Sequence, residues 1–520
     1  MGAIVVIVYY DVTRLISRHS APTPTGIDRV DIHYANYFLN NSEKIRFIYQ
    51  NKGVFFILSK TLAKQLVFDL FDRWIQCGHY ENTLSKLYRL SVGNEKAIKV
   101  KSDLIRFTRY LHGKLKGDEP VDGILIDKLI KDSSEDSVSY INVSHHGVGN
   151  IKAYYVFRTV AKARIIFYLH DIIPIDYPEY VRPGDDENHK KRVRAMAEYG
   201  DLVLVNSAYT KERFISFCNE EGLVYNKIEE AIIGVEKTFL QLSEEFNDAG
   251  SENQGLIDGE YFVYVSTVEP RKNHMLLLEA WRSMVSNGLD VPKLVILGKR
   301  GWNVEHVNDF LDRSPLLENK VVELSGVTDR QMVAIVKNSL GLLFPSFVEG
   351  WGMPLVEAIS LNVPVVCSDI SAFHQSGQNI CVYLDPLDSL GWQKEVLNIY
   401  QNKEYAKTLI SKYQEFKMPS WEVHFDKLKI DLESIVNLKV KSFVKPKSKK
   451  QLKELFAKSN NSRYKALKDI YTERSGGMLV AKGESKLNRK INKFKRDPVS
   501  FFNDSKFFLF RYIGRKLGGV

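Results

Sequence analysis

The segment Phe344–Asp369, FPSFVEGWGMPLVEAISLNVPVVCSD, decides the fold that the sequence predicts. We interpret it as a buried strand ending at Phe344, a glycine-rich loop, a helix with Pro354 at its first position, and a second buried strand. Glycine lets a backbone approach a ligand closely, and the free N–H groups at a helix start attract anions. The segment therefore predicts a strand–loop–helix–strand unit with an anion-binding loop.

Short apolar runs alternate with helical stretches along most of the 520 residues. Such runs, rich in Val, Ile and Leu and separated by helices, are typical of buried parallel strands. The predicted fold class is therefore α/β, with two Rossmann-like doubly wound domains that face a cleft. The predicted strands are Ala3–Tyr10, Arg164–Leu169, Leu202–Val205, Ala231–Ile233, Tyr261–Ser266, Lys293–Leu297, Val321–Leu324, Gly341–Phe344, Pro364–Cys367 and Cys381–Leu384.

A polar stretch at residues 243–259 is the predicted linker between the domains. No internal repeat is visible on either side of it. The predicted organisation is an N-terminal domain at 1–255 with a helical insertion at about 60–135, a C-terminal domain at 260–418, a crossover helix at 419–436, and a basic helical tail at 437–520.

The tail carries the basic charge of the chain. Residues 437–520 hold 23 Lys and Arg against 6 Asp and Glu, whereas the rest holds 50 against 57. A mildly acidic body argues against a nucleic-acid enzyme with a basic cleft. Near the end, Lys and Arg alternate with aromatic residues such as Phe501, Phe507 and Tyr512, which suits an anionic membrane surface. The other interpretation is a helical pair packed on the body, and we favour membrane contact.

The expected location is the cytoplasm, on the inner face of the cytoplasmic membrane. The cysteines Cys77, Cys218, Cys367 and Cys381 are scattered, so neither a disulfide framework nor a zinc site is expected. No run of eighteen apolar residues is present, so no spanning helix is expected. The apolar start Met1–Tyr10 lacks the flanks of a signal peptide and is interpreted as a strand.

Two glutamates flank the predicted anion-binding loop. Glu349 precedes its turn, and Glu357 falls in the first turn of the predicted helix. Carboxylates accept hydrogen bonds from hydroxyls, so a diphosphate held between them would place one near a sugar and one near a ribose. A pair of ordinary surface glutamates is the simpler alternative. The surrounding P-S, E-G-x-G-x-P and V-P-V-V patterns favour a functional pair.

This pattern resembles a known family. Glu349, seven residues and Glu357 resemble the E-x7-E signature of glycosyltransferase family four, the retaining GT-B enzymes. The resemblance extends over residues 11–436 and is strongest after residue 260. Further motifs in the family's order are Tyr264–Asn273 (YVSTVEPRKN), Leu297–Trp302 (LGKRGW), Ser325–Asp329 (SGVTD) and Leu384–Pro386 (LDP). These motifs are specific for the family and weakly specific for the substrate.

The resemblance implies roles for the second domain. Arg271 and Lys272 would neutralise the diphosphate leaving group, a task that a metal performs in other glycosyltransferases. Glu357 would hold the ribose, and Glu349 the donor sugar and its phosphate. The implied donor-binding residues are Arg271, Lys272, Gly326, Val327, Gly350, Gly352, Met353, Pro354, Leu355 and Glu357.

One departure concerns the phosphate grip. Ser266 and Thr267 stand where many members of the family carry Gly-Arg. The contact that this arginine would make with the phosphate is then expected from Arg271 or from Arg29.

Two stretches of the first domain also resemble the family. Thr25–Val30 (TGIDRV) resembles its Gly-rich turn, so Gly26 and Arg29 would reach the diphosphate and the acceptor. His170 and Asp171 follow a predicted strand on the side where doubly wound sheets bind ligands. The implied catalytic residues are His170, near the reacting carbon, Asp171, which orients it, and Glu349.

Other interpretations of the first-domain residues stay open. An isolated His-Asp pair more often is a satisfied histidine and a helix cap, although the resemblance favours function here. The neighbouring His145 and His146 receive no role.

The function predicted is transfer of a hexose, mannose favoured, from a nucleoside diphosphate sugar with retention. The acceptor would be a glycan or lipid-linked oligosaccharide in surface polysaccharide synthesis, such as a capsule or O-antigen. No D-x-D signature appears at a strand end, and Asp185 and Asp186 lie in a predicted polar loop. We therefore expect no metal and no cofactor. Nucleic acid is not an expected partner.

Three alternatives are less favoured. A GT-B epimerase is one, and a phosphorylase is another, although no context for a pyridoxal-phosphate lysine is found. A non-catalytic GT-B subunit that binds glycan or tethers a partner to the membrane is the alternative from a different class.

Overall fold

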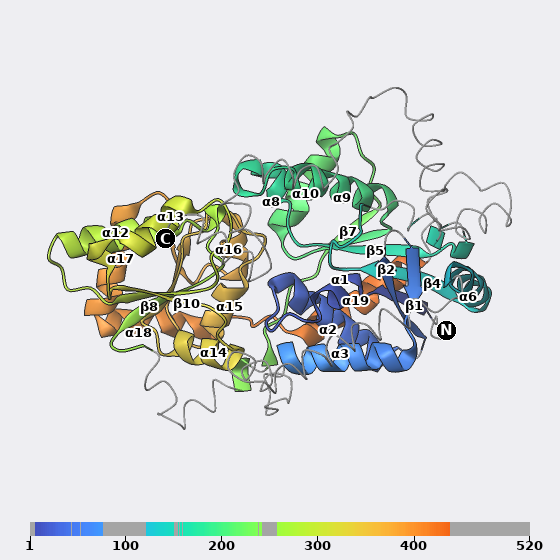
Figure 1. Ribbon diagram of the computed structural model, residues 1–520, viewed down its shortest axis with the longest axis horizontal. Coiled ribbons are helices and arrows are strands. Elements are labelled where there is room, and N and C mark those ends of the chain that lie inside the picture. The colour runs from blue at the N-terminus through green and yellow to red at the C-terminus, as the bar shows by residue number, and fades with distance from the viewer. Residues whose placement is uncertain are drawn as a thin grey trace, which may run out of the picture. The chain divides into compact units, whose positions relative to one another are not determined.

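The computed structural model describes residues 6–75, 121–149, 154–241 and 257–436, apart from positions 43, 52, 53, 155, 156, 159 and 238. Within these residues two sheets form, and helices cover both faces of each (Figure 1). The predicted tail at 437–520 and most of the predicted linker lie outside the described residues. No described helix is long and apolar enough to cross a membrane.

The first sheet has seven described strands in the order β3-β2-β1-β4-β5-β6-β7. All neighbouring pairs are parallel except β2 with β3, which is antiparallel. The strands are β1 (Val6–Asp11), β2 (Ile45–Asn51), β3 (Val54–Ile57), β4 (Ser137–Asn142), β5 (Arg164–Leu169), β6 (Leu202–Val205) and β7 (Lys227–Glu230). The helices of this half are α1 (Thr13–Arg18), α2 (Gly26–Asn41), α3 (Lys60–Trp74), α6 (Val121–Glu135), α8 (Ile173–Asp176), α9 (Asp185–Tyr199) and α10 (Ala208–Glu220), with a 3-10 turn at Pro178–Tyr180.

The second sheet has six described strands, all parallel, in the order β10-β9-β8-β11-β12-β13. They are β8 (Tyr261–Val265), β9 (Lys293–Leu297), β10 (Val321–Leu324), β11 (Gly341–Phe344), β12 (Val365–Ser368) and β13 (Val382–Leu384). The helices are α12 (His274–Ser286), α13 (Glu305–Arg313), α14 (Asp329–Lys337), α15 (Met353–Ser360), α16 (Ser371–Ser376), α17 (Ser389–Gln401) and α18 (Lys403–Ser411). Three 3-10 turns complete this half, at Pro270–Lys272, Pro315–Leu317 and Lys412–Glu415.

Both faces of the first sheet are buried, which explains its continuous apolar strands. Along β1, Val8 and Tyr10 pack into the core under α2, whereas Ile7 and Tyr9 pack into the core under α9. Helices α3 and α6, at the two ends of the predicted insertion, also lie against this sheet. The residues between them lie outside the described part of the chain.

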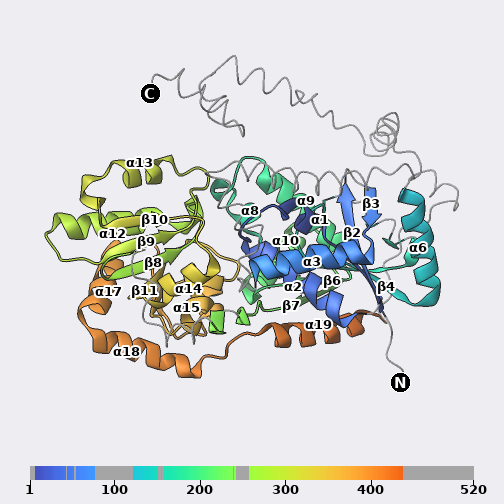
Figure 2. The same cartoon turned by 60° about the horizontal axis from the view of Figure 1, so that its bottom comes forward.

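The last described helix, α19 (Trp421–Val436), returns to the first domain (Figure 2). The His424 ring bonds through Nδ1 to the carbonyl oxygen of Ile232 at 2.7 Å and through Nε2 to the hydroxyl of Tyr34 at 2.8 Å. The helix predicted at 419–436 therefore packs on the first domain although the chain reaches it from the second.

One predicted strand is wrong. Residues 231–233 are not in a strand, and the edge strand is β7 instead. The Ala231 carbonyl accepts a hydrogen bond from the Tyr168 hydroxyl at 2.7 Å, so the chain leaves the sheet there. Charged residues of β7 such as Lys227 and Glu230 suit a strand at the edge of a sheet. Because β7 is not a run of apolar residues, the sequence pattern did not indicate it as a strand.

Two local predictions also need correction. Helix α15 begins at Met353, so Pro354 occupies its second position, and Glu357 lies just beyond its first turn. Asp185 and Asp186 are not in a loop but open α9, where carboxylates favour the positive end of the helix dipole.

Gly234 tests the docking of α19. A Cβ at Gly234 would lie 2.3 Å from the Trp421 backbone nitrogen, whereas one at Gly149 would meet nothing nearer than 4.0 Å. We expect Gly234→Ala to lower the free energy of unfolding by about 1–3 kcal/mol, because the helix must shift. Gly149→Ala should stay within about 0.5 kcal/mol of the unmutated chain. Urea unfolding measures the free energy of unfolding of both variants. Unfolding curves for Gly234→Ala and Gly149→Ala that coincide would contradict the packing of α19 described above.

Candidate functional site

The second sheet places three predicted site residues together. Its strand order reverses between β8 and β11, the point at which open α/β sheets bind ligands beyond the carboxyl ends of their strands. The loop after β8 carries Arg271 and Lys272, and the loop after β11 carries Glu349. The two loops are joined by a hydrogen bond from the Phe347 amide to the Arg271 carbonyl, at 2.8 Å.

These side chains form a buried ion cluster. Arg271 Nη1 lies 2.7 Å from Glu349 Oε2, and its Nη2 lies 2.7 Å from Glu269 Oε1. Lys272 Nζ pairs with the other oxygen of Glu349, to which the Ser346 hydroxyl also donates at 2.9 Å. With two cations and two carboxylates the cluster is balanced, so each charge has a partner in spite of burial.

The charge state of Glu349 follows from these contacts. Burial alone would raise the pKa of the Glu349 carboxyl, but Arg271 and Lys272 lower that pKa to about 2. Glu349 is therefore an anion at neutral pH and a poor proton acceptor. In this structure it holds the two cations that were predicted to meet a diphosphate.

The start of α15 lies beside this cluster. Gly352 has φ +111°, a conformation that disfavours a side chain, and a Cβ there would lie 2.9 Å from the Phe373 ring. Met353, Pro354 and Leu355 follow as the first residues of the helix. Pro354 has no N–H, so the anion-attracting donors at this end come from its neighbours.

The loop after β11 also touches the first domain. A Cβ at Gly350 would lie 2.5 Å from the His170 carbonyl oxygen, so only glycine fits this contact. The Ser207 hydroxyl donates to the Gly350 carbonyl at 2.6 Å, and the Asn206 amide donates to the His170 carbonyl at 2.6 Å. The predicted His-Asp loop and the predicted glutamate loop are thus in direct contact.

His170 is held as a neutral ring. Burial lowers the pKa of His170 to about 4, although a bond to the Val143 carbonyl opposes this. That bond, 2.7 Å from Nε2, requires the proton on Nε2 in the neutral ring and leaves Nδ1 as an acceptor. Asp171 accepts a hydrogen bond from the Ile173 amide at 3.2 Å, so part of the helix-capping alternative is present.

The predicted Gly-rich turn begins α2 and faces α15. Thr25 and Asp28 form a reciprocal capping box, and Arg14 pairs with Asp28 at 2.6 Å, which fixes the turn. A Cβ at Gly26 would lie 2.5 Å from the Met353 side chain. The first-domain turn and the start of α15 are therefore in contact.

Arg29 reaches across to the second domain. Its Nη2 lies 2.6 Å from Asp329 Oδ2, at the start of α14. The preceding loop holds Gly326, with φ +73° and open space beside it, and the half-buried Val327. These backbone positions thus lie just before Asp329, the ion-pair partner of Arg29.

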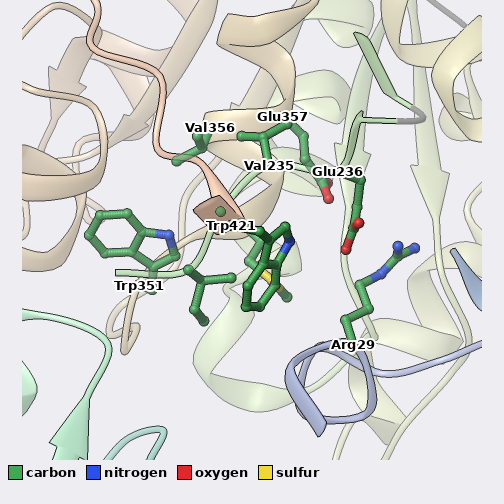
Figure 3. Close-up of a pocket in the computed structure, with 10 residues that line it drawn as sticks. Arg29, Val235, Glu236, Trp351, Val356, Glu357 and Trp421 are labelled. Atoms are coloured by element: carbon green, nitrogen blue, oxygen red, sulfur yellow. The ribbon is translucent and has the colours of Figure 1, made fainter. Parts of the chain in front are cut away.

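A pocket joins Arg29 to Glu357 (Figure 3). It is lined by Arg29, Glu236, Trp351, Glu357 and Trp421, among others. Burial raises the pKa of Glu357 to about 7 against the attraction of Arg29. Asp329 and Glu236 raise that pKa further, because their charges face the same space. Glu349 and Glu357, with seven residues between them, thus differ in pKa as well as in position.

Several residues of the site were not predicted. Asp329 ends the SGVTD motif without a predicted role, and Asn206, Ser207 and Glu236 lie in stretches, 203–207 and 233–239, whose sequence is interpreted as framework. The Asp329–Arg29 ion pair and the Ser207–Gly350 hydrogen bond join the two domains, so no spacing along the chain indicates them. Among the described residues, no group of three or more His, Cys, Asp or Glu side chains is placed to hold a metal.

Comparisons with known sequences agree with these motifs. Residues 251–376, which include the ion cluster and Glu357, match the family model described as Glycosyl transferases group 1. The serotype-specific mannosyltransferase WbdA of Escherichia coli is 28% identical over 267 residues, 48% of this chain and 31% of that protein. The O-antigen chain mannosyltransferase B of Escherichia coli is 24% identical over 261 residues, 50% of this chain and 67% of that protein. The chain thus spans about a third of the length of the first relative.

Comparison with solved structures supports the fold. Anabaena Alr3699/HepE, solved in complex with UDP, superimposes with a TM-score of 0.50 at 14% identity, covering 82% of this chain and 99% of that one. The two Rossmann-like domains are therefore the GT-B fold, as predicted. The match at residues 251–376 and the mannosyltransferase relatives agree with the resemblance to glycosyltransferase family four that the sequence motifs carry.

The pKa of Glu357 predicts a pH dependence of stability. The folded carboxyl binds a proton up to about pH 7, whereas an unfolded one releases it near its ordinary value of about 4.3. The stability that this proton confers is full at about pH 4 and is lost as the pH rises to about 7. Relative to Glu357→Gln, the unmutated chain should lose about 1–3 kcal/mol of unfolding free energy between about pH 5 and 8.

Denaturant unfolding of both proteins across this range measures the difference. Other titrating groups are shared, so they cancel in the comparison. Parallel stability curves for the two proteins would show that Glu357 is already ionised at pH 5.

Proposed function

We propose that this chain transfers a hexose from a nucleoside diphosphate sugar to a glycan or lipid-linked acceptor in surface polysaccharide synthesis. The relatives are named as mannosyltransferases, two of them for O-antigen chains, which favours mannose as the sugar. The observation that carries the proposal is the cluster of Arg271, Lys272 and Glu349 at the switch point of a domain that matches the glycosyltransferase model.

The donor diphosphate would sit at the ion cluster and the start of α15. Arg271 and Lys272 would exchange part of their contact with Glu349 for contact with the departing phosphate. The first amides of α15 lie beside them and would also face the phosphate. The chain's own cations then supply the positive charge that a metal supplies elsewhere. We therefore propose catalysis without a metal ion.

We propose retention at the anomeric carbon through an oxocarbenium-like transition state. The bond from that carbon to the phosphate oxygen breaks, and the acceptor oxygen bonds to the same face. The acceptor proton passes to the departing phosphate oxygen. Two features support this route: Glu349 is tied to two cations, and burial lowers the pKa of His170 to about 4, so both are weak proton acceptors. Neither is a ready general base.

Position at the membrane completes the proposal. The basic and aromatic tail at 437–520 suits an anionic lipid surface, and it would hold the enzyme near a lipid-linked acceptor.

A turnover screen tests this function. Purified chain is incubated with GDP-, UDP-, dTDP- and ADP-sugars, with and without EDTA, and thermal stabilisation and release of the nucleotide are measured. One nucleotide should stabilise the chain, and its sugar should turn over equally in EDTA. Lys272→Ala should lower kcat/KM by at least about 100-fold, because a buried cation at the leaving group is lost.

Lys394→Ala, at an exposed position of α17, is the matched control and should behave as the unmutated chain. Stabilisation without turnover would favour the non-catalytic subunit. No stabilisation by any nucleotide would falsify the proposed function.

A further inference from the structure

The first sheet has a switch point of its own, apart from the proposed donor site. Its strand order reverses between β1 and β4, and open α/β sheets bind ligands at such a point, beyond the carboxyl ends of their strands. Arg14 follows β1, and His145 and His146 follow β4. On α9, the His189 ring lies 5.4 Å from that of His145 between centroids, and Arg192 is the neighbour of His189 one helical turn further on. We call Arg14, His145, His146 and Arg192 the basic cluster.

Arg192 is a half-buried charge without a counter-ion. No described residue forms an ion pair or a hydrogen bond with its guanidinium group, whereas Arg194 on the same helix pairs with Glu221 at 2.9 Å. Burial lowers the pKa of Arg192, and the attraction of Asp185 and Asp171 does not offset burial. Because a charge that has lost part of its water is stabilised by a partner, Arg192 is suited to an anion from outside the chain.

His145 adds a directed hydrogen-bond donor. Burial lowers the pKa of His145, so the ring is neutral at neutral pH. Its Nε2 accepts a hydrogen bond from the His170 amide at 3.1 Å, which leaves the ring proton on Nδ1. Nδ1 has no partner among the described residues. His145 also has φ +60°, a conformation that costs energy in a residue other than glycine and that is found most often at functional sites.

The charges around His146 identify the kind of ligand. Burial lowers the pKa of His146, and the charges of Arg14 and Arg192 lower that pKa further, so both guanidinium groups lie near this ring. Asp28 pairs with Arg14 at 2.6 Å and balances its charge, but the charge of Arg192 stays unbalanced. A guanidinium group beside N–H donors suits a phosphate better than a neutral sugar, because its hydrogen bonds to phosphate are charge-assisted.

Asp171 relates the basic cluster to the reaction centre. Its carboxylate lies near enough to attract Arg192 in the first domain and Arg271 in the second. Arg271 belongs to the ion cluster proposed to meet the donor diphosphate. An anion at Arg192 would therefore stand on the other side of Asp171 from the donor, which is the side of the acceptor.

We infer that the basic cluster binds a phosphate group of the acceptor, with Arg192 and the Nδ1–H of His145 donating to its oxygens. The inference rests on the proposed function and deepens it, because it names the class of acceptor. The acceptor is a phosphate-bearing glycan or glycolipid whose phosphate lies close to the accepting hydroxyl. A neutral glycan end that is far from any phosphate would leave the basic cluster unused.

The test compares two synthetic acceptors with the same mannose disaccharide, one linked to farnesyl diphosphate and the other an octyl glycoside. The full chain is first saturated with the nucleoside diphosphate that it binds best, so that the acceptor phosphate cannot occupy the donor site. Each acceptor is then titrated by calorimetry into the unmutated chain, Arg192→Gln, Arg192→Lys and Arg194→Gln. Arg194→Gln is the matched control, because it removes the same charge from the same helix. Thermal midpoints are measured without ligand.

The unmutated chain and Arg194→Gln should bind the diphosphate-linked disaccharide at least about 10-fold more tightly than the octyl glycoside. Arg192→Gln should lose this preference and bind the octyl glycoside as before, whereas Arg192→Lys should keep part of the preference because it keeps the charge. The thermal midpoint of Arg192→Gln should not fall, because the guanidinium group has no partner among the described residues to lose.

An equal preference for the diphosphate-linked disaccharide in Arg192→Gln and the unmutated chain would overturn the inference, and so would the lack of any preference in the unmutated chain. Vesicles of phosphatidylglycerol test a lipid headgroup as the source of the phosphate. If Arg192→Gln sediments less with these vesicles but keeps its preference between the acceptors, the basic cluster meets the membrane and the inference is wrong. All these outcomes leave the proposed function intact, which fails only if the unmutated chain binds no nucleotide.

Discussion

The structure depends on one buried carboxylate, Glu349, that holds two cations at the switch point of the second sheet. Without it the buried Lys272 would lose its ion-pair partner, at a cost of several kcal/mol, and Arg271 would keep only Glu269. Their positions follow from the fold, because the loops after β8 and β11 can meet only where the strand order reverses. The cluster is therefore a structural element whose side chains are already ordered. Under the proposed function, a diphosphate would meet two cations that are already in place.

The second constraint is the close approach of the two domains. Gly350 lies against the His170 carbonyl and Gly26 against Met353, and a methyl group at either glycine would collide with the opposite domain. The Arg29–Asp329 ion pair and the packing of α19 on the first domain add polar and apolar contacts. The site is thus assembled from both halves of the chain. The pKa of Glu349 is lowered because Arg271 and Lys272 outweigh its burial, whereas burial raises the pKa of Glu357, with Asp329 and Glu236 adding to the rise.

The parts of the fold and of the candidate site that depend on residues close together in the sequence could be predicted from it. The buried parallel strands of the second domain and the E-x7-E spacing are local patterns, and they predicted the fold and two glutamates that the structure places at the ion cluster and at the pocket. The edge strand β7 was missed because its polar residues suit its exposure. The ion pair from Arg29 to Asp329 joins residues 300 positions apart, and the pocket residue Trp421 comes from a helix that leaves one domain for the other. Such contacts depend on how the domains meet, which no spacing along the chain encodes.

The central claim is that Lys272 and its cluster bind the second phosphate of a nucleotide. The most direct measurement compares the affinity for a nucleoside diphosphate with that for its monophosphate, in the unmutated chain, in Lys272→Met and in Lys394→Met. The account predicts that the unmutated chain and Lys394→Met prefer the diphosphate by at least about 10-fold and that Lys272→Met loses this preference while binding the monophosphate as before. An equal preference in all three proteins would contradict the account, because the cluster would then hold the loops together without meeting the phosphate.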